Sequence, residues 1–106
     1  MFIKFDDLDM FDFFISDPVY IGEKEAAHFI YSIEDDYMFS MSLMVDTYGQ
    51  KIDVSVSYDN NIVFAGQFDN ILEIRKSEDV LLVEMESEKR LIIKKSPNLG
   101  VVLESI

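Results

Sequence analysis

Apolar and polar side chains alternate without interruption in the stretch Lys51-Ile52-Asp53-Val54-Ser55-Val56-Ser57-Tyr58. A period of two puts Ile52, Val54, Val56 and Tyr58 on one face of an extended chain and the polar residues on the other. This pattern is typical of a strand in an antiparallel sheet with one face buried and one face in water. We therefore start from a β-strand over residues 51–58.

The same period continues on both sides of this strand. In residues 37–45 one face carries four apolar side chains, and in the strand that begins at residue 26 one face carries three. These seven residues are Phe39, Met41, Leu43 and Val45, then Phe29, Tyr31 and Ile33. Further strands are expected at about 62–68, 71–76, 80–86, 90–95 and 100–104.

The segments between the expected strands are short and polar, such as Glu34-Asp35-Asp36, Asp59-Asn60-Asn61 and Ser77-Glu78-Asp79. Links of this length join antiparallel neighbours, because a parallel crossover needs a dozen or more residues. The chain is long enough for one domain, residues 1–106. We expect a mainly β fold, an antiparallel meander of seven or eight strands that forms a sandwich or a partly open barrel.

A short helix is expected before the strands. Asp6 or Asp7 can cap it, and Leu8, Phe11 and Ile15 recur at helical spacing with Phe14 beside them. Ser16-Asp17-Pro18 ends it, because the residue before a proline avoids the helical region. An extended conformation for residues 11–15 stays open, since four of these five side chains are large and apolar.

Composition narrows the possible functions. The chain has 49% apolar residues, no cysteine and a net charge of −12. This apolar content is too high for intrinsic disorder, and the missing cysteines exclude disulfides, thiolate metal sites and a cysteine nucleophile. The acidity argues against direct binding to nucleic acid or an anionic membrane. The acids that follow Met1-Phe2-Ile3-Lys4-Phe5 interrupt any secretory signal, so we expect a cytoplasmic protein.

The usual catalytic and metal-binding patterns do not stand out. His28 is the single histidine, and neither a nucleophilic serine nor further metal ligands can be assigned to it. Counting a calcium loop from Asp7 puts Asp12 where glycine is needed and Pro18 where glutamate is needed. The four glycines are isolated, so they form no phosphate loop. We expect no enzyme activity, no metal and no cofactor.

The negative charge is concentrated near the N-terminus. Residues 1–46 hold 11 acids and 2 bases, a net charge of −9, whereas residues 47–106 hold 10 acids and 7 bases, a net charge of −3. Solubility alone does not explain this skew, although keeping a Phe-rich domain soluble is the simpler interpretation. We interpret the acids of the helix and of the first hairpin as a partner-binding surface made of Asp6, Asp9, Asp12, Asp17, Glu34, Asp35, Asp36 and Tyr37.

The chain also resembles a known class of proteins. Its size, acidity, lack of cysteine, strand-rich body and opening residues Met1-Phe2-Ile3-Lys4-Phe5-Asp6-Asp7 are similar to those of immunity proteins of bacterial contact-dependent growth inhibition. The resemblance implies a protein that is a monomer when free and that binds one cognate toxin domain. That toxin would be basic and a nuclease, blocked at its active site or at an adjacent exosite.

Two alternatives stay open. A small acidic secretion chaperone would be an obligate homodimer that holds an extended partner along apolar grooves. A β-barrel or sandwich could instead bind an apolar small molecule in its Phe- and Met-rich interior.

Overall fold

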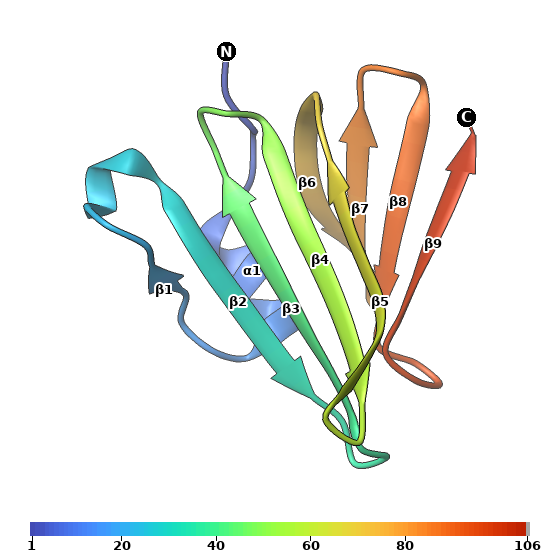
Figure 1. Ribbon diagram of the computed structural model, residues 1–106. Helices are drawn as coiled ribbons and strands as arrows, with labels where there is room; N and C mark the ends of the chain where they lie inside the picture. The colour runs from blue at the N-terminus through green and yellow to red at the C-terminus, as the bar shows by residue number, and fades with distance from the viewer. Residues whose placement is uncertain (106) are drawn as a thin grey trace.

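The computed structural model describes residues 1–105 and forms a β-sandwich of two antiparallel sheets with a helix at one side (Figure 1). The first sheet holds, in spatial order, β1 (Val19–Tyr20), β2 (His28–Glu34), β3 (Phe39–Asp46), β4 (Lys51–Tyr58) and β5 (Asn61–Phe68). The second sheet holds β6 (Ile71–Ser77), β7 (Val80–Met85), β8 (Lys89–Lys94) and β9 (Gly100–Ser105). The predicted antiparallel meander is confirmed, and of the two expected forms the sandwich is found.

Alternation along the strands produces the predicted inner face. Leu43 of β3 lies opposite Val54 of β4, and both are fully buried. The polar residues that alternate with the buried ones along the two strands face outward, where Ser42 of β3 lies opposite Ser55 of β4. Tyr58 departs from this pattern, because it lies at the end of β4, where it is 45% exposed and its ring rests on Phe39.

The core lies between the two sheets and extends under the helix. Burial of apolar side chains is the main driving force of folding, and this core buries them. Its buried members are Ile3, Met10, Phe13, Phe14, Phe29, Tyr31, Met41, Leu43, Val45, Ile52, Val54, Val56, Ile71, Ile74, Leu81, Val83, Met85, Leu91, Ile93 and Leu99.

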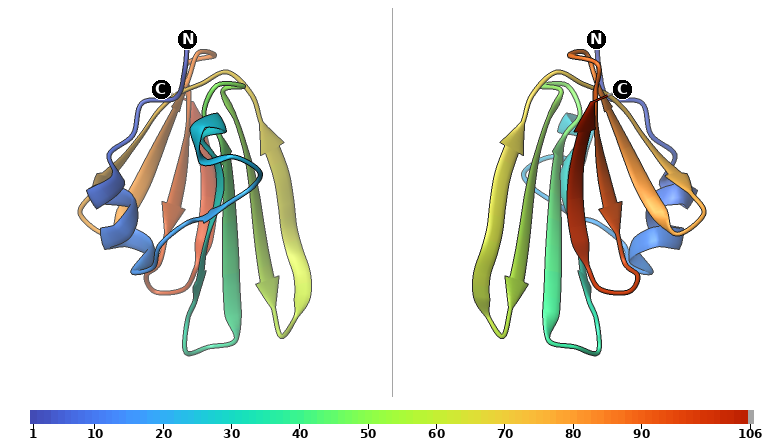
Figure 2. Two further views of the ribbon diagram at one scale, coloured as in Figure 1. Left: turned by 90° about the vertical axis from the view of Figure 1, so that its left-hand side faces the viewer. Right: turned by 90° about the vertical axis from the view of Figure 1, so that its right-hand side faces the viewer.

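Helix α1 (Asp7–Phe14) is present as expected, which excludes the extended alternative for residues 11–14. The carboxylate of Asp6 accepts a hydrogen bond from the backbone N–H of Leu8 and caps the helix start. The helix ends at Ile15, which has a left-handed conformation (φ 54°) and donates its N–H to the carbonyl of Phe11. α1 contacts both β2 and β6, so it closes one side of the sandwich (Figure 2).

The apolar face that the sequence suggested for this helix is correct for Phe14 and wrong for the other three residues. Met10, Phe13 and Phe14 are the side chains that enter the core. Leu8, Phe11 and Ile15, by contrast, are 73%, 46% and 70% exposed. The helix therefore has two apolar stripes, and the sandwich covers one of them.

Smaller differences concern the strand boundaries. β2 begins at His28 rather than at residue 26, because a 3-10 helix, η1 (Lys24–Ala26), and a left-handed Ala27 (φ 51°) precede it. The two-residue strand β1 was not expected, since two residues are too few to show a period. No helix in the described part of the chain is long and apolar enough to cross a lipid bilayer.

Candidate functional site

A surface hollow lies between the end of α1 and the second half of β2, and we call it the α1–β2 cleft. Its volume is about 490 Å³, and it is lined by Phe14, Ile15, Ser16, Ser32, Ile33 and Glu34. The cleft joins the two segments that carry most of the predicted binding residues. The end of the helix and the end of β2 thus meet at this hollow, and Glu34 is the predicted binding residue in its lining.

Two contacts hold the walls of the cleft together. The ring of Phe14 stacks on that of Tyr31, with centroids 4.9 Å apart and planes inclined by 15°. The Ser16 hydroxyl lies 3.5 Å from the Ser32 carbonyl oxygen, to which it donates a hydrogen bond. The cleft is therefore part of the packed structure and not a gap beside a loose segment.

The surroundings of the cleft are negative. Burial, and after it the nearby carboxylates of Asp7 and Asp17, raise the pKa of the Tyr31 hydroxyl to about 12. Glu34 belongs to the lining itself. At the end of α1 the ammonium group of Lys95 meets the carbonyl oxygen of Phe13 and opposes the negative end of the helix dipole, so the carboxylates are the source of this potential.

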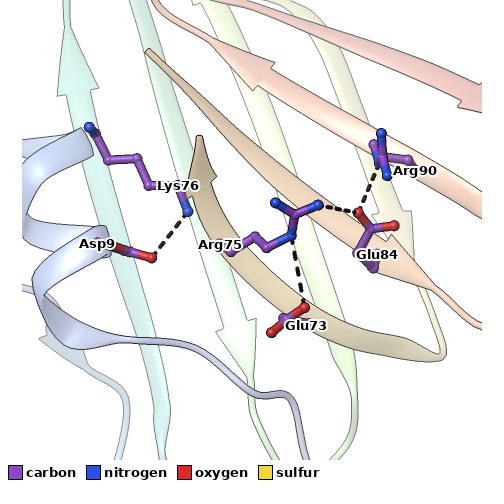
Figure 3. A network of polar contacts seen from close by, with 6 residues as sticks. All are labelled: Asp9, Glu73, Arg75, Lys76, Glu84 and Arg90. Atoms are coloured by element: carbon purple, nitrogen blue, oxygen red, sulfur yellow. Dashed lines mark hydrogen bonds and ion pairs between the residues drawn. The ribbon is translucent and has the colours of Figure 1, made fainter. Parts of the chain in front are cut away.

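The helix acids divide into two groups. Asp6 caps α1, and the Asp9 carboxylate accepts a hydrogen bond (3.2 Å) from the backbone N–H of Lys76 in β6 (Figure 3). Asp9 therefore helps to dock the helix, and it does not share an open face with Asp12. Asp12 and Asp17 are exposed, and within residues 1–105 neither makes a hydrogen bond or an ion pair.

The hairpin acids divide in the same way. One carboxylate oxygen of Asp35 accepts hydrogen bonds from the backbone N–H groups of Tyr37 (2.8 Å) and Phe39 (2.9 Å), which fixes the turn between β2 and β3. Its other oxygen is buried without a partner in the described structure. Glu34, Asp36 and Tyr37 have exposed side chains.

The ion pairs of the described residues lie in the second sheet. Glu84 contacts Arg75 at 3.4 Å and Arg90 at 2.8 Å, and Arg75 also reaches Glu73 (Figure 3). Arg90 also reaches Glu104. Carboxylates of residues 1–46 take part in none of these pairs. The −9 charge of that segment is consequently not neutralised by contacts with bases within the described chain.

Sequence reasoning missed the apolar part of this site. Leu8, Phe11 and Ile15 are exposed on α1 beside Asp12, and Ile15 also lines the cleft. The signal was available, because the helix contains more apolar residues than one buried stripe requires. Large apolar side chains beside free carboxylates suit contact with a partner that is both basic and apolar.

The groups weighed for catalysis are not brought together. His28 lies at the start of β2, opposite Asp46 of β3, whose carboxylate accepts a hydrogen bond from the N–H of Gly49. Within residues 1–105 no three potential ligands cluster in a way that could hold a metal ion.

The described residues form a small acidic β-sandwich with a helix at its side, an apolar cleft whose lining includes Glu34, and unpaired carboxylates on the helix segment and the first hairpin. The same fold occurs in a solved structure described as a contact-dependent growth inhibition toxin–immunity protein complex from Klebsiella pneumoniae 342. The match has a TM-score of 0.82 and 19% sequence identity, and it covers 100% of this chain and 100% of the matched chain. The resemblance to these immunity systems therefore holds for the fold. Comparisons with protein-family models and with curated proteins give no match.

Proposed function

We propose that this protein is an immunity protein that binds and neutralises a cognate toxin domain. The toxin is cationic and a nuclease, and the protein covers its active site or an adjacent exosite. The protein acts in the cytoplasm and catalyses no reaction itself. The observation that carries this proposal is the set of carboxylates on the helix segment and the first hairpin that have no basic partner in the described chain.

The mechanism follows from the chemistry of a nuclease surface. A nuclease holds phosphates with arginine and lysine, and carboxylates at the same spacing can occupy those cations in place of the nucleic acid. The opposite charges of the two proteins speed their encounter. Asp12, Asp17, Glu34 and Asp36 have no competing partner within the described chain, so they are the acids most available for this role.

The cleft adds contact area to the electrostatic attraction. Its floor is apolar at Phe14, Ile15 and Ile33, and its rim is negative at Glu34. An arginine or lysine side chain fits this arrangement, because its aliphatic stem can lie on the apolar floor while its charged end meets a carboxylate. Tyr37 at the hairpin tip can add an aromatic contact.

The fold likeness supports the proposal independently of charge. It extends over the whole of both chains and includes no large unmatched part. The filled interior argues for the same conclusion, because the inward-facing side chains of both sheets pack into one continuous core. A protein that carried an apolar ligand between its sheets would need that space.

The test is co-expression with the toxin domain encoded next to this protein. We expect growth to be restored and the two purified proteins to form a complex whose association rate falls steeply with salt. A toxin that remains lethal in the presence of the folded protein would refute the proposal. An obligate dimer at nanomolar concentration that grips an unfolded segment would favour the secretion chaperone instead.

A further inference from the structure

The outer strand edges are better covered on one side of the sandwich than on the other. On the side of α1, the two-residue strand β1 ends the first sheet and covers the edge of β2 at Phe29 and Ile30, and the edge of β6 is occupied by a bridge from Lys4 and by the carboxylate of Asp9. On the opposite side, β5 and β9 end their sheets, and within residues 1–105 no strand pairs with their outer edges. In both views of Figure 2, α1 and β5 lie at opposite sides of the molecule.

Strand β5 lacks the usual protection of an open edge. Natural edge strands carry charges or proline, which discourage pairing with other chains. Residues 60–68 read Asn-Asn-Ile-Val-Phe-Ala-Gly-Gln-Phe and contain neither, in a chain of net charge −12. Ile62 and Val63 are 68% and 59% exposed, and Phe64 is also exposed. The pairing with β4 passes from Val56–Phe64 to Ser57–Ile62, so Val63 is an extra residue in β5, and this bulge is the one protective device that β5 shows.

Strand β9 is less suited to pairing. It exposes Val102 and Leu103 but carries Glu104, which contacts Arg90 of β8 at 3.6 Å. The outer edges of β5 and β9 therefore differ in charge. A substitution on β9 serves as the control for a substitution on β5.

We propose that β5 is a self-association edge, and that two copies of this chain pair antiparallel through it to join their five-stranded sheets. A strand edge is complementary to itself when two copies are related by a twofold axis. Two copies of an acidic protein repel each other except where their surfaces are neutral, and β5 is such a place. A cationic partner gains nothing from a strand without carboxylates. The second copy is therefore the occupant that the charge distribution favours.

Charge also selects the register. Asp59 and Asp69 lie just beyond the two ends of β5. A twofold axis at Ala65 keeps Asp69 of one copy from lying directly opposite Asp59 of the other, and like charges directly opposite are destabilising. We therefore place the axis at Ala65.

The dimer goes beyond the proposed function and does not depend on it. Because α1 and the α1–β2 cleft lie on the side opposite β5, each copy can still bind its partner. One strand pair is a small interface, so the dimer forms reversibly and the free protein is a monomer when dilute. This behaviour distinguishes it from the obligate dimer of a secretion chaperone.

Sedimentation velocity from low micromolar to near-millimolar concentration tests the pairing. We expect the wild-type chain to shift from monomer to dimer and Ala65→Lys to stay monomeric, because two lysines meet at the axis. Val102→Lys on β9 makes the same change in net charge and should dimerise like wild type. Circular dichroism confirms that both variants are folded. A wild type that stays monomeric throughout, or a dimer that survives Ala65→Lys, would refute the proposal.

Single cysteines test the register, since the native chain contains none. Two copies of Ala65→Cys would lie directly opposite each other at a Cα separation of about 5 Å, which suits a disulfide. In Gln67→Cys the two cysteines would be about 14 Å apart along the strands and should not cross-link. Under mild oxidation we expect a covalent dimer of the first variant alone. Cross-linking of the second but not the first would contradict the axis at Ala65.

Discussion

The ammonium group of Lys95 donates a hydrogen bond to the carbonyl oxygen of Phe13 (2.9 Å) and lies 4.9 Å from the centroid of the same residue's ring. One side chain from the end of the second sheet thus satisfies a carbonyl in the last turn of α1 and covers its most buried aromatic residue. A cation at this position also opposes the negative end of the helix dipole.

Lys95→Ala should lower the free energy of unfolding by about 1–2 kcal/mol, because a charged hydrogen bond and a cation–π contact are lost. Lys94 is the matched control, since it has the same charge and makes neither contact. Its change to alanine should stay within about 0.5 kcal/mol. Urea denaturation of the two variants measures both values, and equal effects would contradict the assigned role of Lys95.

Phe13→Ala should be far more destabilising than Phe11→Ala. Phe13 is completely buried, so its loss leaves a cavity and should cost about 3–5 kcal/mol. Phe11 is 46% exposed, so its loss should cost less than about 1 kcal/mol. Thermal unfolding, monitored by circular dichroism, measures the loss of stability in each of the two variants. The reverse order would mean that the helix buries the face that the sequence first suggested.

Asp6 and Asp12 should separate stability from binding. Asp6→Ala removes the cap of α1 and should cost about 1 kcal/mol of stability. Asp12→Ala should leave stability unchanged within about 0.5 kcal/mol but weaken the toxin complex. Denaturation and calorimetric titration, applied to both variants, give the two readouts. A binding loss confined to Asp6→Ala would argue against the cleft surface.

Reversing the charge of Glu34 and Asp36 to lysine should slow toxin association roughly tenfold at low salt and flatten the salt dependence. Glu86→Lys with Glu88→Lys is the control, because these acids lie between β7 and β8 at the opposite end of the molecule (Figure 1). It makes the same change in net charge. If both double variants slow association equally, general charge and not the cleft surface attracts the toxin.

Tyr31 should make the fold sensitive to alkali. The pKa of its hydroxyl is raised to about 12 in the folded protein from an ordinary value of 10.0, so folding favours the protonated form. The resulting stabilisation is complete below pH 10 and is lost as the pH rises toward 12, by an amount on the order of 2 kcal/mol. Tyr31→Phe should lose this part of the pH dependence in urea titrations between pH 9 and 11. An unchanged slope in that variant would assign the effect to other groups.

Strands β3 and β4 of the first sheet could be predicted because each buries one face. Burial forces a period of two on β3 and β4, and that period is visible in the sequence around Leu43 and Val54. The inner face of α1 could not be predicted. Its two apolar stripes, marked by Phe11 and Phe13, have similar hydropathy, and packing against β2 and β6 decides between them.

The site was predictable as a region but not residue by residue. The sequence places the acids near the N-terminus, but a carboxylate shows its role only through the groups that fold against it. Asp9 meets a backbone N–H from a residue 67 positions away, whereas Asp12, three residues further along, meets none in the described chain. The composition of the segment does not distinguish Asp9 from Asp12.

The strand pairing divides the chain into two consecutive parts, one for each sheet. Within residues 1–105 each sheet is a contiguous run of neighbouring strands, and the chain passes from one sheet to the other at Asp69 and Asn70. Apart from the bridge between Lys4 and Glu73, a break at that point would leave every paired strand on the same fragment as its neighbour. Two separately produced fragments, 1–69 and 70–106, could therefore be reassembled through side-chain packing.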